Sequence, residues 1–327
     1  MKAAWFSTFG PANEVLKIGE QPTPSPESGE VLVRLSRSAV NPSDVKKRAG
    51  SFPNLLDQGL VIPNSDGSGV IEAVGGGVDS ARIGERVWVY QAQFQRRFGT
   101  AAQYLTIDAC RAVKLPEQTS DSEDAYLGIP AMTAHRCVFA DGDIRGQKVL
   151  VTGGAGRVGH YAIQLAALQG AQVIATASNA TDRKACIEAG AHAVVNHRDA
   201  NWAEEVLESC SGPVDRVIDV EFGANLPEVL KLISVGGVIA TYSSTQLTEP
   251  KLPFFQMMYQ DLTVRLIIVY AMPEPAKTEA IAAITQLLGQ GILKHRIATE
   301  LPLNEISAAN ELVESGKCRG SVLLTVD

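Results

Sequence analysis

A glycine-rich turn in the middle of the chain constrains its fold more than any other feature. The stretch KVLVTGGAGRVGHYAIQLAALQG (148–170) begins with an apolar run, breaks at the turn and resumes with helical spacing. Gly154, Gly156 and Gly159 satisfy the pattern G-x-G-x-x-G between a strand and a helix. Such glycines permit a tight turn, the close approach of a pyrophosphate and the packing of helix on strand, and the helix N-terminus adds unpaired N–H groups. The pattern predicts a dinucleotide site; the alternative is a glycine turn that joins strand and helix without a ligand.

Strand and helix patterns alternate after this turn. Short segments rich in Val and Ile are predicted to be strands, and helical patterns separate most of them. The predicted strands cover residues 172–177, 193–197, 216–220, 237–242 and 262–270. Because strand-helix repetition builds a parallel, doubly wound sheet, this part of the chain is predicted to be an α/β Rossmann unit.

The first third of the chain has a different pattern. Short β-branched and aromatic runs alternate there with turns rich in Gly, Pro and Asp. The runs cover residues 30–40, 68–75, 86–92 and 102–107. They predict an antiparallel, barrel-like β unit.

The chain ends in GSVLLTV, a strand pattern without a partner in the parallel sheet. We therefore predict that it returns to the first domain and makes that domain discontinuous. The expected division is residues 1–125 plus 271–327 for one domain and 126–270 for the other. Residues 121–139, DSEDAYLGIPAMTAHRCVF, are predicted to be helical with an acidic start.

Composition excludes some classes of partner. The 327 residues carry a formal charge of -7, which argues against nucleic acid or an anionic membrane as the main partner. No stretch approaches the ~20 apolar residues of a membrane helix. The first residues lack the apolar core of a secretion signal, and the five cysteines are scattered. We expect a cytoplasmic protein with reduced thiols.

The residues after the second predicted strand of the Rossmann unit indicate which dinucleotide binds. An NAD site usually has a carboxylate there, whereas this chain has Ser178 and Asn179, followed by Arg183 and Lys184. A hydroxyl, an amide and a guanidinium suit a 2′-phosphate, so NADP(H) is favoured. Asp182 counts against this interpretation.

Other catalytic patterns are absent from the sequence. It contains no H-E-x-x-H, no G-x-S-x-G and no Walker lysine after the glycines. The five histidines do not cluster. Only His197, at the end of a predicted strand of the sheet, remains a candidate cofactor contact.

Several segments carry a resemblance to a known family. AVNPSDVKKRAGSF, IPNSDGSGVIEAVG, IPAMTAHRCV, VLVTGGAGRVG and LVESGKCRGSVLL resemble the quinone oxidoreductase (zeta-crystallin-like) branch of the medium-chain dehydrogenase/reductase superfamily. The similarity covers nearly the whole chain in order. It implies a Rossmann domain inserted into a GroES-like, mostly antiparallel β-barrel domain.

The resemblance also implies that no metal takes part. Zinc-dependent members have a cysteine near the position of Asn41 and Gly-His-Glu where this chain has NSDGSG. A catalytic zinc needs three protein ligands, which the matching positions do not supply. The expected activity is metal-free, NADPH-dependent reduction of quinones or other α,β-unsaturated carbonyls, with the hydride delivered from the nicotinamide in the interdomain cleft.

Site residues follow from the same resemblance. Asn41 and Asp44 match the segment beside the nicotinamide, and Lys46 stands where relatives often have tyrosine. Lys46 is a candidate proton donor or substrate contact, although VKKR also fits a solvated helix face. The resemblance implies further cofactor contacts at Thr133, Tyr242, Ser243, Lys317 and Arg319. Arg157 departs from the family, because it replaces a glycine usual in this branch; it is a candidate phosphate contact, and the alternative is a side chain that points into solvent. Val158, beside it in the glycine turn, is a further candidate cofactor contact.

Two questions stay open on the sequence alone. In the resembling proteins the last strand of the Rossmann unit pairs with its twin across a two-fold axis, so the resemblance implies a homodimer through sheet extension at 262–270, an edge that would otherwise invite aggregation. The physiological acceptor is not defined. Alternatives to quinone reduction are an enoyl-thioester or 2-alkenal reductase on the same scaffold, or a protein that binds NADPH without turnover in a structural or redox-sensing role.

Overall fold

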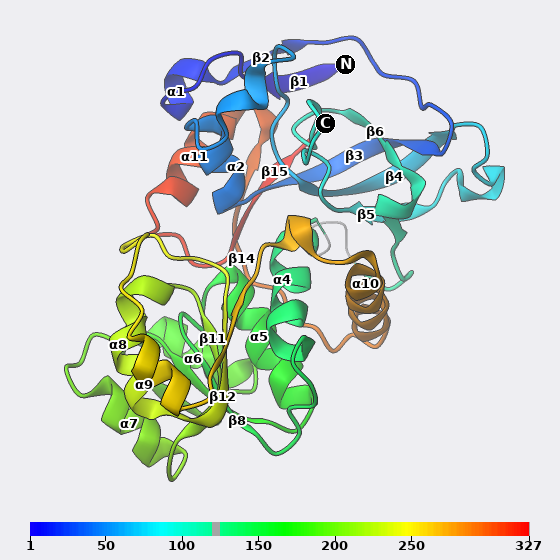
Figure 1. Cartoon of the computed structure of the whole chain (residues 1–327). Helices are drawn as coiled ribbons and strands as arrows, with labels where there is room; N and C mark the ends of the chain where they lie inside the picture. The colour runs from blue at the N-terminus through cyan, green and yellow to red at the C-terminus, as the bar shows by residue number, and fades with distance from the viewer. Residues whose placement is uncertain (120–124, 327) are drawn as a thin grey trace. The chain divides into compact units, whose positions relative to one another are not determined.

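The chain forms two compact units in a computed structural model that describes residues 1–119 and 125–326 (Figure 1). The first unit comprises Met1–Ile129 and Ile281–Asp327, and the second comprises Pro130–Ala280. Helices α4 (Gly128–Phe139) and α10 (Glu274–Gly289) contain the divisions between them. Among the described residues, no helix is long and apolar enough to cross a membrane.

The first unit is built on a mostly antiparallel sheet whose central strand is β3 (Glu30–Val40). The sheet order is β14-β15-β3-β4-β5-β7, and β6 also pairs with β3. The strands are β4 (Asp66–Val74), β5 (Arg86–Val89), β6 (Tyr104–Asp108), β7 (Ala112–Lys114), β14 (Ile297–Pro302) and β15 (Ser321–Thr325), with β1 (Lys2–Trp5) and β2 (Lys17–Glu20) in a separate hairpin. The helices are α1 (Ala12–Val15), α2 (Pro42–Arg48) and α11 (Ile306–Glu314), with short 3₁₀ turns η1 (Pro53–Leu56), η2 (Ser80–Arg82), η3 (Ala109–Arg111) and η5 (Leu303–Glu305).

The C-terminal strand joins this sheet, as the sequence predicts. β15 pairs antiparallel with β3, with Val322 opposite Val40, and lies parallel to β14. Val322, Leu323 and Leu324 are fully buried. Burial of these side chains supplies the hydrophobic free energy that returns the end of the chain to the first unit.

The second unit contains the predicted parallel sheet. Its strand order is β10-β9-β8-β11-β12-β13, in which the direction of winding reverses between β8 and β11. The strands are β8 (Lys148–Val151), β9 (Gln172–Thr176), β10 (Ala193–Val195), β11 (Val214–Asp219), β12 (Ile233–Thr241) and β13 (Thr263–Leu266). The helices are α5 (Arg157–Leu168), α6 (Ala180–Glu188), α7 (Trp202–Ser209), α8 (Phe222–Leu232) and α9 (Phe254–Tyr259), followed by the 3₁₀ turn η4 (Val269–Ala271). The α/β Rossmann fold class is confirmed.

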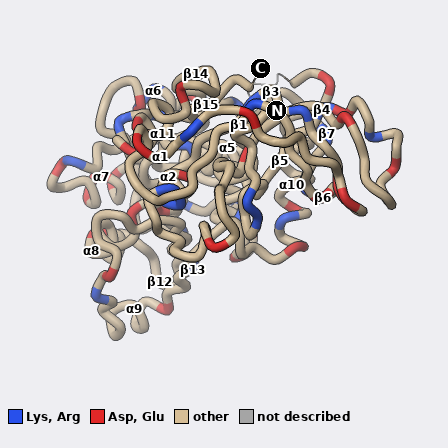
Figure 2. Tube along the Cα trace, turned by 90° about the horizontal axis from the view of Figure 1, so that it is seen from above, with Lys and Arg blue, Asp and Glu red and all other residues tan. Residues whose placement is uncertain are grey.

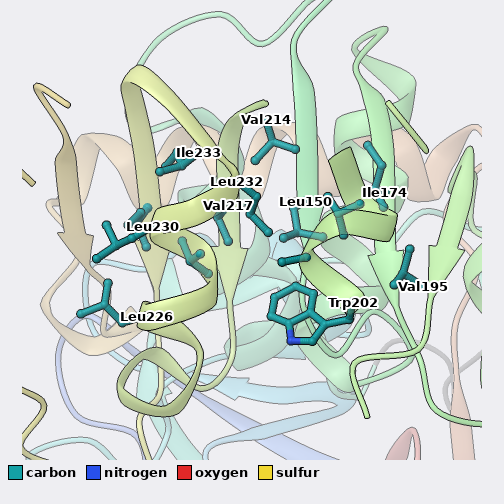
Figure 3. Packing of buried hydrophobic residues seen from close by; sticks show 14 of the residues in the cluster. Leu150, Ile174, Val195, Trp202, Val214, Val217, Leu226, Leu230, Leu232 and Ile233 are labelled. Carbon is teal, nitrogen blue, oxygen red and sulfur yellow. The ribbon is translucent and has the colours of Figure 1, made fainter. Parts of the chain in front are cut away.

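One apolar cluster packs α7 and α8 against the sheet of the second unit. It includes Leu150 of β8, Ile174 of β9 and Val217 of β11, together with Trp202 of α7 and Leu226 of α8 (Figure 3). Burying a large aliphatic side chain contributes about 2 kcal/mol. The core therefore sets the positions from which the carboxyl ends of the strands project.

A buried cation anchors the end of α4. The Arg216 guanidinium, only 1% exposed, donates to the carbonyl oxygens of Val138 at 2.8 Å and Asp141 at 2.9 Å. The Asp141 carboxylate in turn pairs with Arg265 of β13. Positive charge at a helix C-terminus is favourable, because the last carbonyl groups have no partner within the helix.

Several predictions of secondary structure were wrong in their extent: the strands predicted over 86–92 and 193–197, for example, end at Val89 and Val195. β13 ends at Leu266, not at residue 270, because its partner β12 ends at Thr241, opposite Leu266. The helix predicted over 121–139 begins only at Gly128 in the described part of the chain, because residues 125–127 are not helical; residues 121–124, its predicted acidic start, lie outside the described residues.

Candidate functional site

The glycine-rich turn joins β8 to α5 in the second unit. Gly153 has a φ of 61°, in the left-handed region that glycine tolerates, and Gly156 is the N-cap of α5. The turn is bound to the next strand through Thr176, whose hydroxyl accepts from the Gly153 N–H at 2.9 Å and whose carbonyl accepts from the Gly154 N–H at 3.0 Å. The turn is held by the sheet before any ligand binds.

The three motif glycines are required for different reasons. A Cβ at Gly154 would lie 2.8 Å from the Ala175 Cβ, and one at Gly159 would lie 2.5 Å from the Gly153 carbonyl oxygen. Packing alone therefore requires glycine at those two positions. A Cβ at Gly156 meets only the Gly153 oxygen, at 3.1 Å. The fold nearly tolerates a side chain at Gly156, so close approach of a ligand is the stronger reason for glycine there.

A buried carboxylate holds the ends of β8 and β11 together beside the turn. Asp219 accepts from the Thr152 hydroxyl at 2.5 Å and from the Asn225 amide at 2.7 Å. The Thr152 hydroxyl also accepts from the Val220 N–H at 3.0 Å. Burial raises the pKa of the Asp219 carboxyl. These hydrogen bonds link the carboxyl ends of β8 and β11 next to the glycine turn.

The segment after β9 forms a helix cap. The Asn179 side chain accepts from the Asp182 N–H at 2.9 Å and donates to the Asp182 carboxylate at 2.7 Å. Asp182 is buried, whereas Asn179 and Arg183 are exposed and Ser178 is half-buried. The carboxylate that counted against a phosphate site is therefore bound within the cap, and the Arg183 cation stands at the surface.

The other predicted residues of the second unit fall into two groups. Arg157 and Val158 begin α5, and Tyr242 and Ser243 follow β12 directly, so both pairs lie at the carboxyl edge of the sheet with the glycine turn. The Tyr242 N–H donates to the Asp219 carbonyl at 3.3 Å, and burial raises the pKa of the Tyr242 hydroxyl well above its usual value. The second group comprises Thr133, which is buried within α4, and His197, which is exposed two residues beyond β10.

In the first unit, Asn41 and Asp44 lie together at the start of α2. The Asn41 N–H donates to the Asp44 carboxylate at 2.9 Å, and the Ser65 hydroxyl donates to the same carboxylate at 3.3 Å. Both Asn41 and Asp44 are 2% exposed. Burial raises the pKa of the Asp44 carboxyl, since the charged form loses its hydration.

The two adjacent lysines of α2 have opposite environments. Lys46, the predicted one, is exposed. Lys47 is buried, and its ammonium donates to the Gln93 carbonyl at 2.8 Å and to the Ser65 hydroxyl at 3.4 Å. Burial lowers the pKa of Lys47. The helical spacing from Asp44 to Lys47 was the available signal for this pair, because residues three apart share a helix face.

Sequence reasoning also missed Asp66 at the start of β4. Its Oδ2 accepts from the Asn41 side-chain amide at 2.9 Å and from the Ile129 N–H at 2.9 Å. Desolvation raises the pKa of Asp66 to about 8. The only signal was its place in NSDGSG, at the position of the glutamate in zinc-dependent relatives. We call Asn41, Asp44, Lys47, Ser65 and Asp66 the polar cluster.

The residues of the polar cluster do not fit a zinc ion. A catalytic zinc takes three ligands from Cys, His and carboxylate, whereas a lysine ammonium, a serine and an asparagine share this cluster. Over residues 1–119 and 125–326, no three His, Cys, Asp or Glu side chains gather as a metal site would require.

Lys317 and Arg319 lie in the loop between α11 and β15 of the first unit. Both side chains are exposed. The Arg319 guanidinium donates to the Gly316 carbonyl at 2.5 Å, and the Lys317 N–H donates to the Ser315 hydroxyl at 3.2 Å. The loop therefore has local order, and a role in cofactor binding stays a prediction.

Comparison with known families agrees with this geometry. Residues 27–117 match the model of the alcohol dehydrogenase GroES-like domain, and residues 158–286 match that of the zinc-binding dehydrogenases. The quinone oxidoreductase of Rattus norvegicus is 30% identical over 335 residues, covering 99% of this chain and 98% of the relative. The chain belongs to the quinone oxidoreductase branch of the medium-chain dehydrogenase/reductase superfamily. It is an oxidoreductase, and its fold, with GroES-like and Rossmann domains, is confirmed.

Solved structures of this superfamily have the same fold. A mycobacterial protein complexed with NADPH is 26% identical, with a TM-score of 0.87 over 99% of this chain and 100% of the other. The quinone oxidoreductase of Coxiella burnetii is 27% identical, with a TM-score of 0.85 over 100% and 99%. The structure of an NAD-dependent alcohol dehydrogenase is 27% identical, with a TM-score of 0.86 over 100% of both chains. Since overall likeness is similar for all three, cofactor choice must be argued from this chain's own residues.

Proposed function

We propose that this oxidoreductase uses NADPH to reduce quinones or other α,β-unsaturated carbonyls without a metal. The observation that carries the proposal is the pairing of a permissive Gly156 with a β9 end that presents Ser178, Asn179 and Arg183. The carboxylate of Asp182, in the same helical turn, is bound to Asn179. A site for the 2′-phosphate needs donors and tolerates no free carboxylate.

The chain's groups suit the two ends of such a cofactor. The main-chain N–H groups at the start of α5 would hold the pyrophosphate, with Arg157 and Val158 in the same turn. Ser178, Asn179 and Arg183 would hold the 2′-phosphate. Thr133, His197, Tyr242, Ser243, Lys317 and Arg319 remain proposed contacts with the rest of the cofactor.

At the reacting end, the chain supplies position and electrostatics. The bound cofactor supplies the hydride, and quinones and enones accept it with little activation. We propose that Asn41 and Asp44 border the acceptor, because they match the segment beside the nicotinamide in the family that this chain resembles; buried hydrogen bonds fix both side chains. Lys46 is exposed, so its proposed role is contact with substrate. Donors preorganised in the polar cluster would favour the negative charge that develops on the acceptor oxygen.

A cofactor and acceptor screen tests this function. NADPH and NADH are titrated separately by calorimetry, and oxidation of each is then followed by absorbance with a quinone panel, a 2-alkenal and an enoyl thioester. We expect tighter binding of NADPH and oxidation with quinones above the enzyme-free rate. Preference for the thioester would assign the chain to the alternative reductase activity. Binding without turnover on any acceptor would instead indicate a non-catalytic protein.

Replacing Arg183 by alanine tests the cofactor assignment. Loss of a charge-assisted hydrogen bond to phosphate should weaken NADPH binding about 10- to 100-fold and leave NADH binding unchanged. The matched control is Lys184→Ala, because Lys184 is also exposed and pairs with Glu188 at 3.7 Å. Equal losses for NADPH and NADH in the Arg183 variant would contradict a 2′-phosphate contact.

We further propose that the subunits dimerise through the edge of the second unit. An exposed apolar surface, here called the α9–β13 surface, adjoins the free side of β13. It comprises Leu252, Phe254, Phe255, Met258, Tyr259, Leu266 and Ile268, of which Tyr259 is 77% and Leu266 75% exposed. The chain trace carries no charged residue along α9 (Figure 2). A surface of this kind beside an open sheet edge fits a second copy of the same edge.

A further inference from the structure

Asp66 connects two parts of the first unit through a single oxygen atom. Its Oδ2 accepts from the Asn41 side-chain amide and from the Ile129 N–H, both at 2.9 Å. Ile129 belongs to the first turn of α4, which continues to Thr133. Asp66 is fully buried. One side chain therefore sets both the orientation of the Asn41 amide and the start of a helix that carries a proposed cofactor contact.

Among the residues that the structure describes, the second oxygen of Asp66 has no hydrogen-bond partner. Oδ1 is buried and makes no hydrogen bond with any residue of 1–119 or 125–326. It faces the backbone of α4 so closely that a Cβ on Gly128 would lie 2.3 Å from it and 2.7 Å from the Tyr90 Cβ. A negatively charged oxygen in such a place would lose its hydration without compensation. The free oxygen is the natural position for a proton, which leaves Oδ2 as the acceptor.

The charged groups around Asp66 also favour the proton. Two carboxylates, Asp44 and Asp66, share the cluster with one ammonium, that of Lys47. Lys47 donates to the Gln93 carbonyl and the Ser65 hydroxyl. Tyr90 also adjoins Gly128, and its hydroxyl donates to the Cys110 carbonyl at 3.5 Å. Like charges that share a buried site favour protonation of one of them.

We propose that Asp66 is a positioning residue that acts as a neutral carboxylic acid. It fixes the Asn41 amide and the first turn of α4 without adding a second carboxylate charge, besides that of Asp44, near the acceptor. The inference rests on the proposed function, because a reduced quinone or enone gains negative charge on oxygen, and an ionised Asp66 next to Asn41 would oppose it. Neutrality is what distinguishes this role from that of an ordinary structural carboxylate.

The pH dependence of stability gives a direct test. The pKa of Asp66 is raised to about 8 in the folded chain from 3.8. The stability that this proton contributes is present below pH 3.8 and is lost as the pH rises toward 8. Asp66→Asn keeps an oxygen acceptor and cannot ionise. We expect this variant to melt several degrees above the wild type at pH 8.5, and to lose that advantage at pH 5.

Two further variants complete the test. Asp66→Ala removes the acceptor and should lower the melting temperature at both pH values. Asp57→Asn, at an exposed position in the same unit, should leave the difference between pH 5 and pH 8.5 as in the wild type. If Asp66→Asn lowers the melting temperature equally at both pH values, Asp66 acts as an anion and the proposal is overturned.

Activity supplies a second, independent readout. Turnover of the wild type should fall as Asp66 ionises above pH 7. In the Asp66→Asn variant, turnover should depend less on pH in this range. An unchanged decrease of turnover above pH 7 in that variant would contradict the positioning role. The melting experiment needs no substrate. If the wild type does not reduce quinones, the proposed function is refuted, but the melting experiment still shows whether Asp66 is protonated.

Discussion

Replacing Gly156 by valine should abolish NADPH binding and leave the fold intact. The Gly156 backbone, with φ −75° and ψ 172°, suits any residue, and a Cβ there meets only one atom, at 3.1 Å. A branched side chain would occupy the space that a pyrophosphate needs beside the first turn of α5. Loss of that approach should weaken binding by a factor of about 100 or more, or about 2.7 kcal/mol. Calorimetric titration with NADPH measures it, and Gly156→Ala should give a smaller loss.

A neighbouring glycine provides the control. Gly159→Ala places a Cβ 2.5 Å from the Gly153 carbonyl oxygen, so it should lower thermal stability, whereas Gly156→Val should change it by about 1 kcal/mol at most, the scale of an N-cap effect. Normal NADPH binding by a folded Gly156→Val variant would mean that the turn joins strand to helix without holding the cofactor.

Lysine in place of Leu266 should convert the proposed dimer to monomers. Because the Ile267 N–H donates to the Thr241 carbonyl of β12 at 2.8 Å, the Leu266 N–H points to the open side of the sheet. In a two-fold dimer the substitution appears twice, and each buried leucine lost costs about 2 kcal/mol. We expect the dissociation constant to rise at least about 100-fold, as measured by sedimentation over a range of concentrations.

The matched control for this variant is Ile187→Lys on α6. Ile187 is 48% exposed in the same unit, and it lies outside the α9–β13 surface. It should leave the mass unchanged. A wild-type mass of one chain, 34.8 kDa, at micromolar concentration would refute the dimer.

Local patterns predicted the strands better than their pairing. The predicted strand 30–40 has the bounds of β3, because β-branched alternation and flanking turns are local signals. β14 was not predicted, since Ile297–Pro302 becomes a strand only by pairing with β15. β13 was predicted too long because its length depends on where β12 ends. Such limits are set by contacts between distant segments.

The same distinction explains what was found of the candidate site. Asn41 and Asp44 stand in one short motif, and the glycine turn is equally compact. Lys47 and Asp66 were missed because a sequence shows that a residue can be charged and does not show that it is buried. The contact of Asp66 with Asn41 spans 25 positions in the chain, and that with Ile129 spans 63. Environment, not residue type, makes these groups unusual.

The two arginines at Asp141 bear on how subunits would come together. Arg265 attaches β13 to the Asp141 carboxylate, and Arg216 holds the carbonyl of the same residue from β11. The edge strand β13 is therefore held by an ion pair within its own subunit, and this contact needs no second subunit. A dimer that forms through β13 would assemble from subunits that are already folded. Exchange of subunits between dimers would not require either chain to unfold.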